Sequence, residues 1–143
     1  MSVLFLCRGN SARSQIAEAW GKHLSNGRLI FASAGTFPSR EVHPLAVQVM
    51  AEVGIDISGA SPKNFTEVPK PIHSIIAVCG QSEDECPNWP GLAVETWAID
   101  DPVEVSGTED ARLTAFRVVR DQLRPLVEDY LVRNEGDRQL DSD

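Results

Sequence analysis

Cys7 and Arg13 are two side chains near the start of the chain that could together act on an anion. The chain reads Cys-Arg-Gly-Asn-Ser-Ala-Arg-Ser from Cys7 to Ser14, so five residues separate the thiol from the guanidinium. Arg13 can bind a tetrahedral oxyanion with two parallel N–H donors. A cysteine beside a cation and a helix N-terminus loses its proton readily, and the thiolate is a strong nucleophile. Such a pair also occurs by chance, but it could place a nucleophile at the base of an oxyanion-binding loop.

The residues between them suit a loop that wraps its backbone around an anion. Gly9 permits close approach of the backbone to a ligand, and Asn10 tolerates a left-handed conformation. N–H groups at a helix N-terminus converge on one point, where the helix dipole favours negative charge. The Ser14 hydroxyl could donate a further hydrogen bond to the sulfur. The residues expected to bind the oxyanion are Arg8, Gly9, Asn10, Ser11, Ala12, Arg13 and Ser14.

Cys7 also has a plain structural interpretation. A cysteine that ends a buried strand is most often a small, inert core residue. The flanking pattern favours the functional interpretation, because the apolar run 3–6 has strand length and helical spacing begins at Ile16. Cys7 is therefore expected at a strand-to-helix turn.

Apolar runs of strand length alternate with segments of helical spacing along the chain. Strands are expected over residues 3–6, 29–32, 73–78 and 92–98, and helices over residues 16–24, 44–53, 107–133 and, as a short turn, 65–68. Such alternation implies a parallel sheet, so the chain is expected to be a single α/β domain. Pro125 should kink or divide the last helix. Residues 134–143 are polar and acidic and are expected to form a disordered tail.

Four chemically useful side chains follow the expected strands. They are Cys7, Ser33, Cys79 and Asp101, and the carboxyl ends of parallel strands share one edge of the sheet, where ligands bind. Asp101 precedes Pro102 and could simply begin a turn. At that edge, however, its carboxyl could also protonate a departing oxygen as a general acid.

The other two cysteines allow two interpretations. Cys79 could be a core thiol at the end of a central strand, and Cys86 an ordinary loop residue. An exposed thiol beside a proline in an acidic loop is nevertheless unusual unless it reacts. The chain has three cysteines, and disulfides of cytosolic proteins are mostly transient and catalytic. Position alone favours the inert interpretation, whereas the unusual setting of Cys86 favours the reactive one.

The composition excludes several classes of function. A formal net charge of −8 argues against nucleic acid and acidic membrane surfaces as partners. No apolar run has transmembrane length and no signal-peptide pattern is present, so a cytoplasmic location is expected. The three histidines show no metal-site spacing and no nucleotide-binding pattern occurs. We therefore expect no metal and no cofactor. A monomer is expected as well.

The segment from Val3 to Gln15 resembles the phosphate-loop signature Cys-x-Gly-Asn-x-x-Arg-Ser. This signature is shared by low-molecular-weight protein tyrosine phosphatases and by thioredoxin-coupled arsenate reductases of the same fold. The resemblance extends to about Tyr130. It implies a phosphatase-like domain over residues 1–133, with a flavodoxin-like three-layer sandwich, a four-stranded parallel sheet and helices on both faces. Gln15 favours the reductases, because the phosphatases usually carry proline after Arg-Ser.

Two further segments resemble the reductases. The pattern Val-Cys-x6-Cys-Pro, which contains Cys79 and Cys86, is similar to their redox segment, and the phosphatases lack this pair. Trp-Ala-Ile-Asp-Asp-Pro, which contains Asp101, is similar to their Trp-x-x-Asp-Asp-Pro. The phosphatases typically carry aromatic residues after Asp-Pro, whereas Val103 follows here. Ala12 departs from both families, many members of which have a second loop cysteine at this position.

The resemblance implies an arsenate reductase of arsenic detoxification, with phosphate or sulfate as analogues of arsenate. Cys7 would attack arsenic while Asp101 protonates the leaving hydroxyl. Cys79 would then attack Cys7 with release of arsenite, and Cys86 would carry the disulfide to the surface for thioredoxin.

Three alternatives remain open at this stage. The first is a phosphatase that hydrolyses phosphate monoesters, phosphotyrosine among them, through a Cys7 phosphocysteine. The second is an arsenate reductase coupled to a low-molecular-weight thiol and a glutaredoxin-like partner. The third is an oxyanion-binding or redox-sensing module without turnover.

Overall fold

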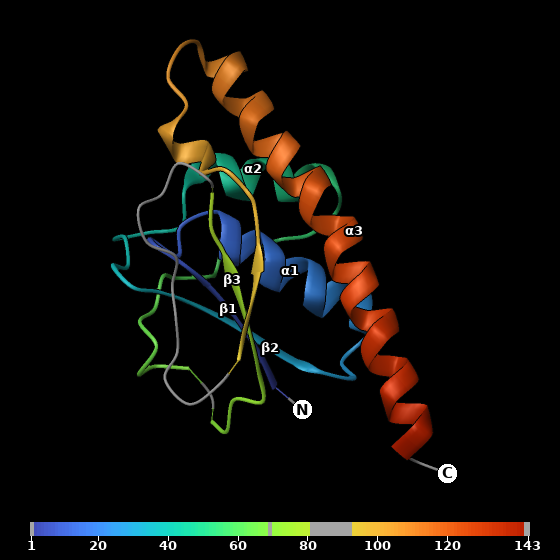
Figure 1. The fold of residues 1–143 in the computed structure, drawn as a ribbon. Coiled ribbons are helices and arrows are strands. Elements are labelled where there is room, and N and C mark those ends of the chain that lie inside the picture. Colours follow the sequence, from blue (N-terminus) through green and yellow to red (C-terminus); the bar gives the residue numbers. More distant parts are fainter. Residues whose placement is uncertain (1, 69, 81–92, 142–143) are drawn as a thin grey trace.

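A computed structural model describes residues 2–68, 70–80 and 93–141, with side chains described up to residue 134. Strands and helices alternate over the first half of the chain, and a fourth strand and a long last helix follow (Figure 1). The elements are β1 (Ser2–Cys7), α1 (Arg13–Ser25), β2 (Ile30–Gly35), α2 (Pro44–Glu52), β3 (Ser74–Val78), β4 (Val94–Trp97), the 3₁₀-helix η1 (Pro102–Glu104) and α3 (Glu109–Asp141). The predicted segment 65–68 contains turns and bends rather than a helix.

The four strands form one parallel sheet in the order β2-β1-β3-β4. β1 lies between β2 and β3, and all six of its residues are buried. Four of these six buried residues are Val, Leu or Phe, which fit a strand covered on both faces. The predicted single α/β domain with a four-stranded parallel sheet is therefore confirmed, and it places the ends of β1 and β3 side by side.

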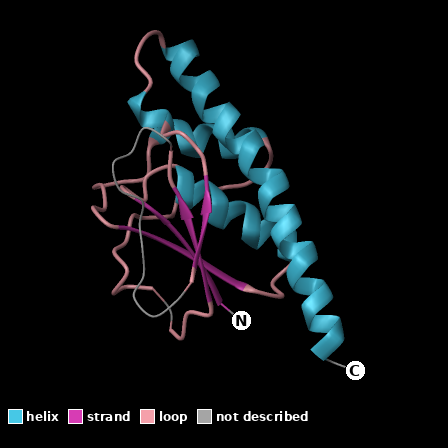
Figure 2. Cartoon of the chain, in the orientation of Figure 1, coloured by secondary structure: helices cyan, strands magenta, loops and turns pink. Residues whose placement is uncertain are grey.

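The three α-helices contribute to the core on one face of the sheet (Figure 2). Side chains alternate along β1, so Val3 and Phe5 join the helical core, whereas Leu4 and Leu6 join a smaller cluster on the other face. Val68, from the long connection before β3, closes part of that cluster. Helices on both faces were expected, but on this second face the described covering is irregular chain.

The sequence of that connection gives a reason for its irregularity. Residues 58–72 contain Gly59, Pro62 and Pro71, and these residues disfavour a continuous helix. The chain therefore covers the sheet with turns and extended segments, which still bury apolar side chains such as Val68.

Pro125 does not divide α3, which runs unbroken from Glu109 to Asp141. Proline removes one helical hydrogen bond, but Pro125 is exposed, so water can satisfy the freed carbonyl group. Leu123 and Val127, on the opposite side of the helix, are completely buried and hold this part of α3 against the core. The helix extends beyond its predicted end near residue 133. Disorder of residues 134–143 stays a prediction.

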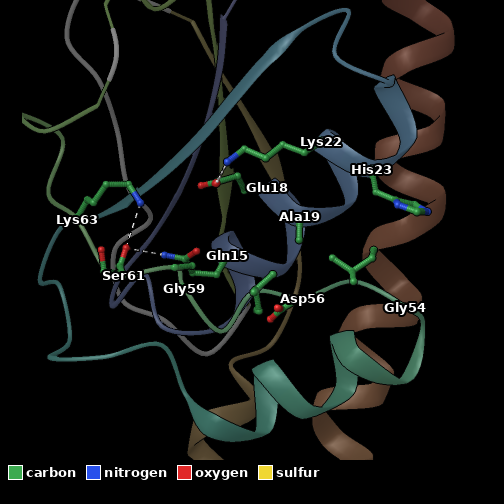
Figure 3. Close-up of a pocket in the computed structure, with 13 residues that line it drawn as sticks. Gln15, Glu18, Ala19, Lys22, His23, Gly54, Asp56, Gly59, Ser61 and Lys63 are labelled. Carbon is green, nitrogen blue, oxygen red and sulfur yellow. Dashed lines mark hydrogen bonds and ion pairs between the residues drawn. The ribbon is translucent and has the colours of Figure 1, made fainter.

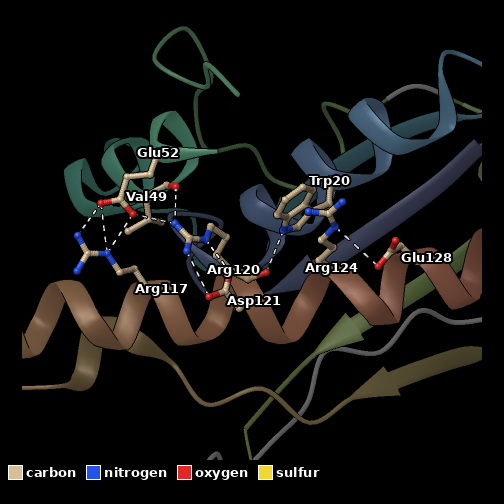
Figure 4. A network of polar contacts seen from close by, with 8 residues as sticks. All are labelled: Trp20, Val49, Glu52, Arg117, Arg120, Asp121, Arg124 and Glu128. Carbon is tan, nitrogen blue, oxygen red and sulfur yellow. Dashed lines mark hydrogen bonds and ion pairs between the residues drawn. The ribbon is translucent and has the colours of Figure 1, made fainter. Parts of the chain in front are cut away.

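Polar contacts hold α3 against α1 and α2 (Figure 4). Arg117 and Arg120 both bind the Glu52 carboxylate, with shortest distances of 2.6 and 2.8 Å. Trp20 of α1 donates its indole N–H to the Arg120 carbonyl oxygen at 3.0 Å, and Arg124 lies 5.1 Å from the centre of the Trp20 ring. These contacts fix the helical layer behind the loop that follows β1. Among the described residues, no helix combines the length and apolar character that a membrane span requires.

Candidate active site

Cys7 is the last residue of β1 and Arg13 is the first residue of α1, so residues 8–12 form the predicted strand-to-helix loop. Hydrogen bonds hold the outer side of this loop to the chain that follows β2. The carbonyl oxygens of Cys7, Arg8, Gly9 and Ser11 accept from the N–H groups of Thr36, Phe37, Ser39 and His43 at 2.8–3.2 Å. In a trans peptide unit the N–H points opposite to the C=O. The N–H groups of residues 8, 9, 10 and 12 are therefore directed to the inner side of the loop.

Two local features let the loop close around its centre. Asn10 has a φ of 52°, and its N–H donates to the Cys7 sulfur at 3.2 Å. Within the described loop, no side chain caps α1 at Ala12, so the first N–H groups of the helix remain available to a ligand. The geometry is that of a cradle for an anion, with the sulfur at its base.

Cys7 is a free thiol and is 2% exposed. The Ser14 hydroxyl oxygen lies 2.9 Å from its sulfur. The Asn10 N–H and the Ser14 hydroxyl are thus two polar groups within reach of the sulfur.

Arg13 and Asp101 come together although they are far apart in the sequence. Arg13 is 2% exposed, and its guanidinium donates to the Ile99 carbonyl oxygen at 3.0 Å. A second guanidinium nitrogen lies 3.5 Å from an Asp101 carboxylate oxygen. The other Asp101 oxygen accepts from the Val103 N–H at 3.0 Å, which fixes the start of η1. The loop after β4 therefore places a carboxyl group beside the arginine of the anion loop.

Cys79 directly follows β3, the strand beside β1. Leu6 is the register partner of Ala77, so the chain ends of these two strands bring Cys7 and Cys79 to the same edge of the sheet. Cys79 is buried and disulfide-bonded, and its N–H donates to the Trp97 carbonyl oxygen at 3.0 Å. Cys86 lies outside the described residues.

Several residues that shape the loop were not singled out from the sequence. Gly35 ends β2 so close to the loop that a Cβ there would lie 2.7 Å from the Arg8 carbonyl oxygen and 2.9 Å from the Asn10 nitrogen. Its position in Ser-Ala-Gly at the end of a strand could have signalled such a close approach. Lys63 was also missed, and its N–H donates to the Asn10 carboxamide oxygen at 2.9 Å.

His43 connects the loop with α2 and α3. Its N–H donates to the Ser11 carbonyl oxygen, and its Nδ1 accepts from the Leu45 N–H at 3.1 Å as the cap of α2. The ring lies 4.7 Å from the Phe116 ring of α3. Burial and the nearby Arg112 guanidinium lower the pKa of His43 from its usual 6.5, because both disfavour a charged ring.

A cavity of about 680 Å³ lies beside the loop, between α1 and residues 54–63 (Figure 3). Its charged groups contact one another or nearby backbone, as Lys22 binds Glu18 at 2.6 Å and Lys63 donates to the Ser61 carbonyl oxygen at 3.0 Å. The second Glu18 oxygen accepts from Ser33 at 2.6 Å. Across residues 2–68, 70–80 and 93–141, no group of three or more His, Cys, Asp or Glu side chains is arranged to hold a metal.

The fold and the loop define a class of protein in which a parallel sheet presents a cysteine at the base of an anion cradle. A model of the family described as low molecular weight phosphotyrosine protein phosphatase matches residues 2–142. The chain belongs to this family.

Curated relatives in this family are named arsenate reductases. One from Halalkalibacterium halodurans is 37% identical over 123 residues, which is 85% of this chain and 88% of the relative. A "glutaredoxin arsenate reductase" from Synechocystis is 36% identical, with 92% of this chain and 96% of the relative covered.

Solved structures agree with this grouping. An arsenate reductase in a phosphate-binding state has a TM-score of 0.76 and 35% identity, and the match covers 92% of this chain and 97% of that one. A thioredoxin-dependent arsenate reductase from Corynebacterium glutamicum has a TM-score of 0.66 and 29% identity, with 92% of this chain and 62% of that one covered. An arginine phosphatase with a TM-score of 0.75 is only 22% identical, so it bears on the fold alone.

Proposed function

We propose that this chain is an arsenate reductase in which Cys7, Cys79 and Cys86 pass a disulfide from the oxyanion site to a protein donor. The observation that carries the proposal is that two cysteines in different states lie at the same edge of the sheet. Cys7 is a free thiol at the base of the anion cradle, and Cys79 is disulfide-bonded at the end of the neighbouring strand. A hydrolase would not need a second reactive sulfur at that position.

The first step is substitution at arsenic. Arsenate would bind to the inner N–H groups of the loop and to Arg13, which supply donors for its oxygens. The Cys7 thiolate attacks arsenic(V), the Asp101 carboxyl protonates the departing oxygen, and water leaves. The Arg13–Asp101 contact at 3.5 Å supports this assignment, because it holds the acid at the rim of the cradle.

The second step transfers electrons. The Cys79 thiolate attacks the Cys7 sulfur, a Cys7–Cys79 disulfide forms, and the S–As electron pair stays on arsenic, which leaves as arsenite. Two thiols are oxidised and arsenic accepts two electrons. The Cys86 thiolate then attacks the Cys79 sulfur, which releases Cys7 and leaves a Cys79–Cys86 disulfide for an external dithiol. A disulfide-bonded Cys79 beside a free Cys7 is the state that this step predicts for these two residues.

The identity of the electron donor is a more specific part of the proposal. Thioredoxin is the donor that we propose, and a structural neighbour that is named thioredoxin-dependent supports it. The Synechocystis relative is named for glutaredoxin, so a thiol and glutaredoxin couple is the second candidate. We further propose that the chain acts as a cytoplasmic monomer.

The decisive experiment is one turnover with arsenate and reduced protein, without external reductant, followed by peptide mapping of the disulfide. The wild type should yield Cys79–Cys86, and Cys86→Ser should stop at Cys7–Cys79. Cys7→Ser should form no arsenite. Normal multiple turnover of Cys86→Ser with thioredoxin would refute the relay.

Two controls separate the alternatives. Replacing thioredoxin with glutathione and glutaredoxin identifies the donor. A phosphatase predicts that the double variant Cys79→Ser, Cys86→Ser hydrolyses phosphate esters at the wild-type rate and that neither protein reduces arsenate. An oxyanion-binding or redox-sensing module predicts binding of arsenate or phosphate without turnover of either.

A further inference from the structure

We propose that Gln15 is a positioning residue that favours the thiolate of Cys7 without touching it. Gln15 acts through two intermediate side chains, those of Asn10 and Ser14. The inference rests on the proposed role of Cys7 as the nucleophile, but it is tested by a reaction that does not need arsenate.

Gln15 is a buried polar side chain, 2% exposed, in the first turn of α1. Its amide nitrogen lies 3.0 Å from the Asn10 carboxamide oxygen and 3.1 Å from the Ser61 carbonyl oxygen. Figure 3 shows Gln15 directed toward Ser61. A backbone carbonyl can only accept, so the nitrogen of Gln15 must face it, and its two hydrogens are then directed to Ser61 and Asn10.

The orientation of Asn10 follows from its partners. The Lys63 backbone N–H, which can only donate, lies 2.9 Å from the same carboxamide oxygen that Gln15 contacts. The nitrogen of Asn10 therefore points the other way, where it donates to the Ser14 hydroxyl oxygen at 2.7 Å. Two donors on the oxygen polarise the amide and strengthen the hydrogen bond that its nitrogen donates.

The hydrogen bond from Asn10 leaves the Ser14 hydrogen available for the last contact, in which either atom could donate. The Ser14 oxygen accepts from Asn10, and the Cys7 sulfur lies 2.9 Å from that oxygen. The Ser14 hydrogen can accordingly be donated to the sulfur, and such a donor stabilises a thiolate more than a thiol. When the sulfur is a thiolate it can only accept, and every hydrogen bond from Gln15 to Cys7 then points toward the sulfur.

A purely structural role for Gln15 makes a different prediction. A buried glutamine that only ties α1 to residue 61 would lower stability when replaced, and would leave the ionisation of Cys7 unchanged. The charged groups around the loop are the same in both cases, since Arg8, Arg13 and Asp101 stay in place. The pH dependence of Cys7 reactivity therefore separates the two roles.

The test uses a Cys79→Ser, Cys86→Ser background, in which Cys7 is the one remaining thiol, because the chain has three cysteines. Alkylation of Cys7 by iodoacetamide is followed as a function of pH. Gln15→Met keeps the volume and removes the donor. It should slow alkylation about 2- to 12-fold below neutral pH, as expected for one hydrogen bond. The plateau rate at alkaline pH should stay the same, since it reports the thiolate itself.

A double-mutant cycle tests the route. In a Ser14→Ala background, which breaks the chain between Asn10 and Cys7, Gln15→Met should have no further effect on the pH profile. Gln48→Met, at an exposed position of α2, is the control for the chemical change. Met50→Ala, at a completely buried position, is the control for lost stability. Both controls should keep the pH profile of the background protein.

Two results would overturn the inference. One is an unchanged pH profile in Gln15→Met; the other is an equal shift with and without Ser14. If Gln15→Met does not fold, Gln15→Leu also removes the donor and adds no charge, so it must also slow alkylation below neutral pH. A chain that shows these shifts but does not reduce arsenate would refute the proposed function and leave the role of Gln15 standing.

Discussion

Gly35→Ala should weaken anion binding without unfolding the protein. Gly35 lies behind the anion loop, and a Cβ at this position would sit 2.7 Å from the Arg8 carbonyl oxygen, 0.7 Å short of an ordinary 3.4 Å contact. The atoms that it meets are backbone atoms of residues 8–10, which cannot rotate away as a side chain could. The loop must therefore move, and its inner N–H groups move with it.

The steric overlap at Gly35 indicates how much anion affinity should be lost. Overpacking by one methyl group costs about 1–3 kcal/mol. If the loop absorbs the strain, a similar amount is lost from anion binding, which corresponds to a roughly 5- to 150-fold weaker affinity. Calorimetric titration with phosphate and with arsenate measures this loss, and urea unfolding measures any strain that reaches the rest of the fold.

Gly59→Ala is the matched control, because a Cβ at Gly59 meets no described atom within 4 Å. It should bind phosphate like the wild type. The reasoning is refuted if Gly35→Ala binds phosphate within about twofold of the wild type and unfolds at the same urea concentration, since a loop that tolerates the added methyl is not held as closely as the structure indicates.

Three further predictions concern single side chains. Asp101→Asn should slow arsenate reduction by about 10²–10⁴-fold at saturating arsenate, as expected for a lost general acid. The variant should still bind phosphate. An unchanged rate of reduction would exclude the acid role of Asp101. The His43 ring is favoured neutral in the fold, so its contribution to stability is complete above the usual pKa of 6.5 and disappears as the pH falls through its lowered folded value. His43→Asn keeps a cap for α2 and should flatten this part of the urea midpoint profile; a profile equal to that of the wild type would argue against the assignment. Hydrogen bonds from Arg117 and Arg120 lower the pKa of Glu52 to about 2, although desolvation raises it. Glu52→Gln should therefore lower the urea midpoint, and the loss should be smaller at high salt, which screens the ion pairs. An equal loss at low and high salt would contradict an electrostatic origin.

The anion loop could be predicted from the sequence because its determinants are local. An apolar strand, a cysteine, glycine and asparagine at turn positions, and an arginine at a helix start all fall within residues 3–16. The residues that hold this loop could not be identified in the same way. Gly35 and Lys63 approach Asn10 only after the chain has folded back, and no local periodicity records such long-range contacts.

The helices, too, could be predicted only in part from the sequence. Their periodicity gave the three long helices, but it did not show on which face of the sheet they pack. Pro125 was expected to interrupt α3, since propensity alone takes no account of exposure. Its side chain faces solvent while Leu123 and Val127 are buried, so packing of the opposite face outweighs the local defect.

The net charge of −8 limits how this protein can bind an anion. The summed field disfavours the approach of arsenate, so the affinity must come from donors within a few ångströms. The loop meets this requirement, because its carbonyl groups are bound on the outer side and its N–H groups point inward around a buried guanidinium. Surface charges beyond the screening length of about 8 Å contribute little at physiological salt. Removing a remote acid such as Glu128 should therefore leave anion affinity unchanged, whereas displacing one backbone segment behind the loop should weaken it.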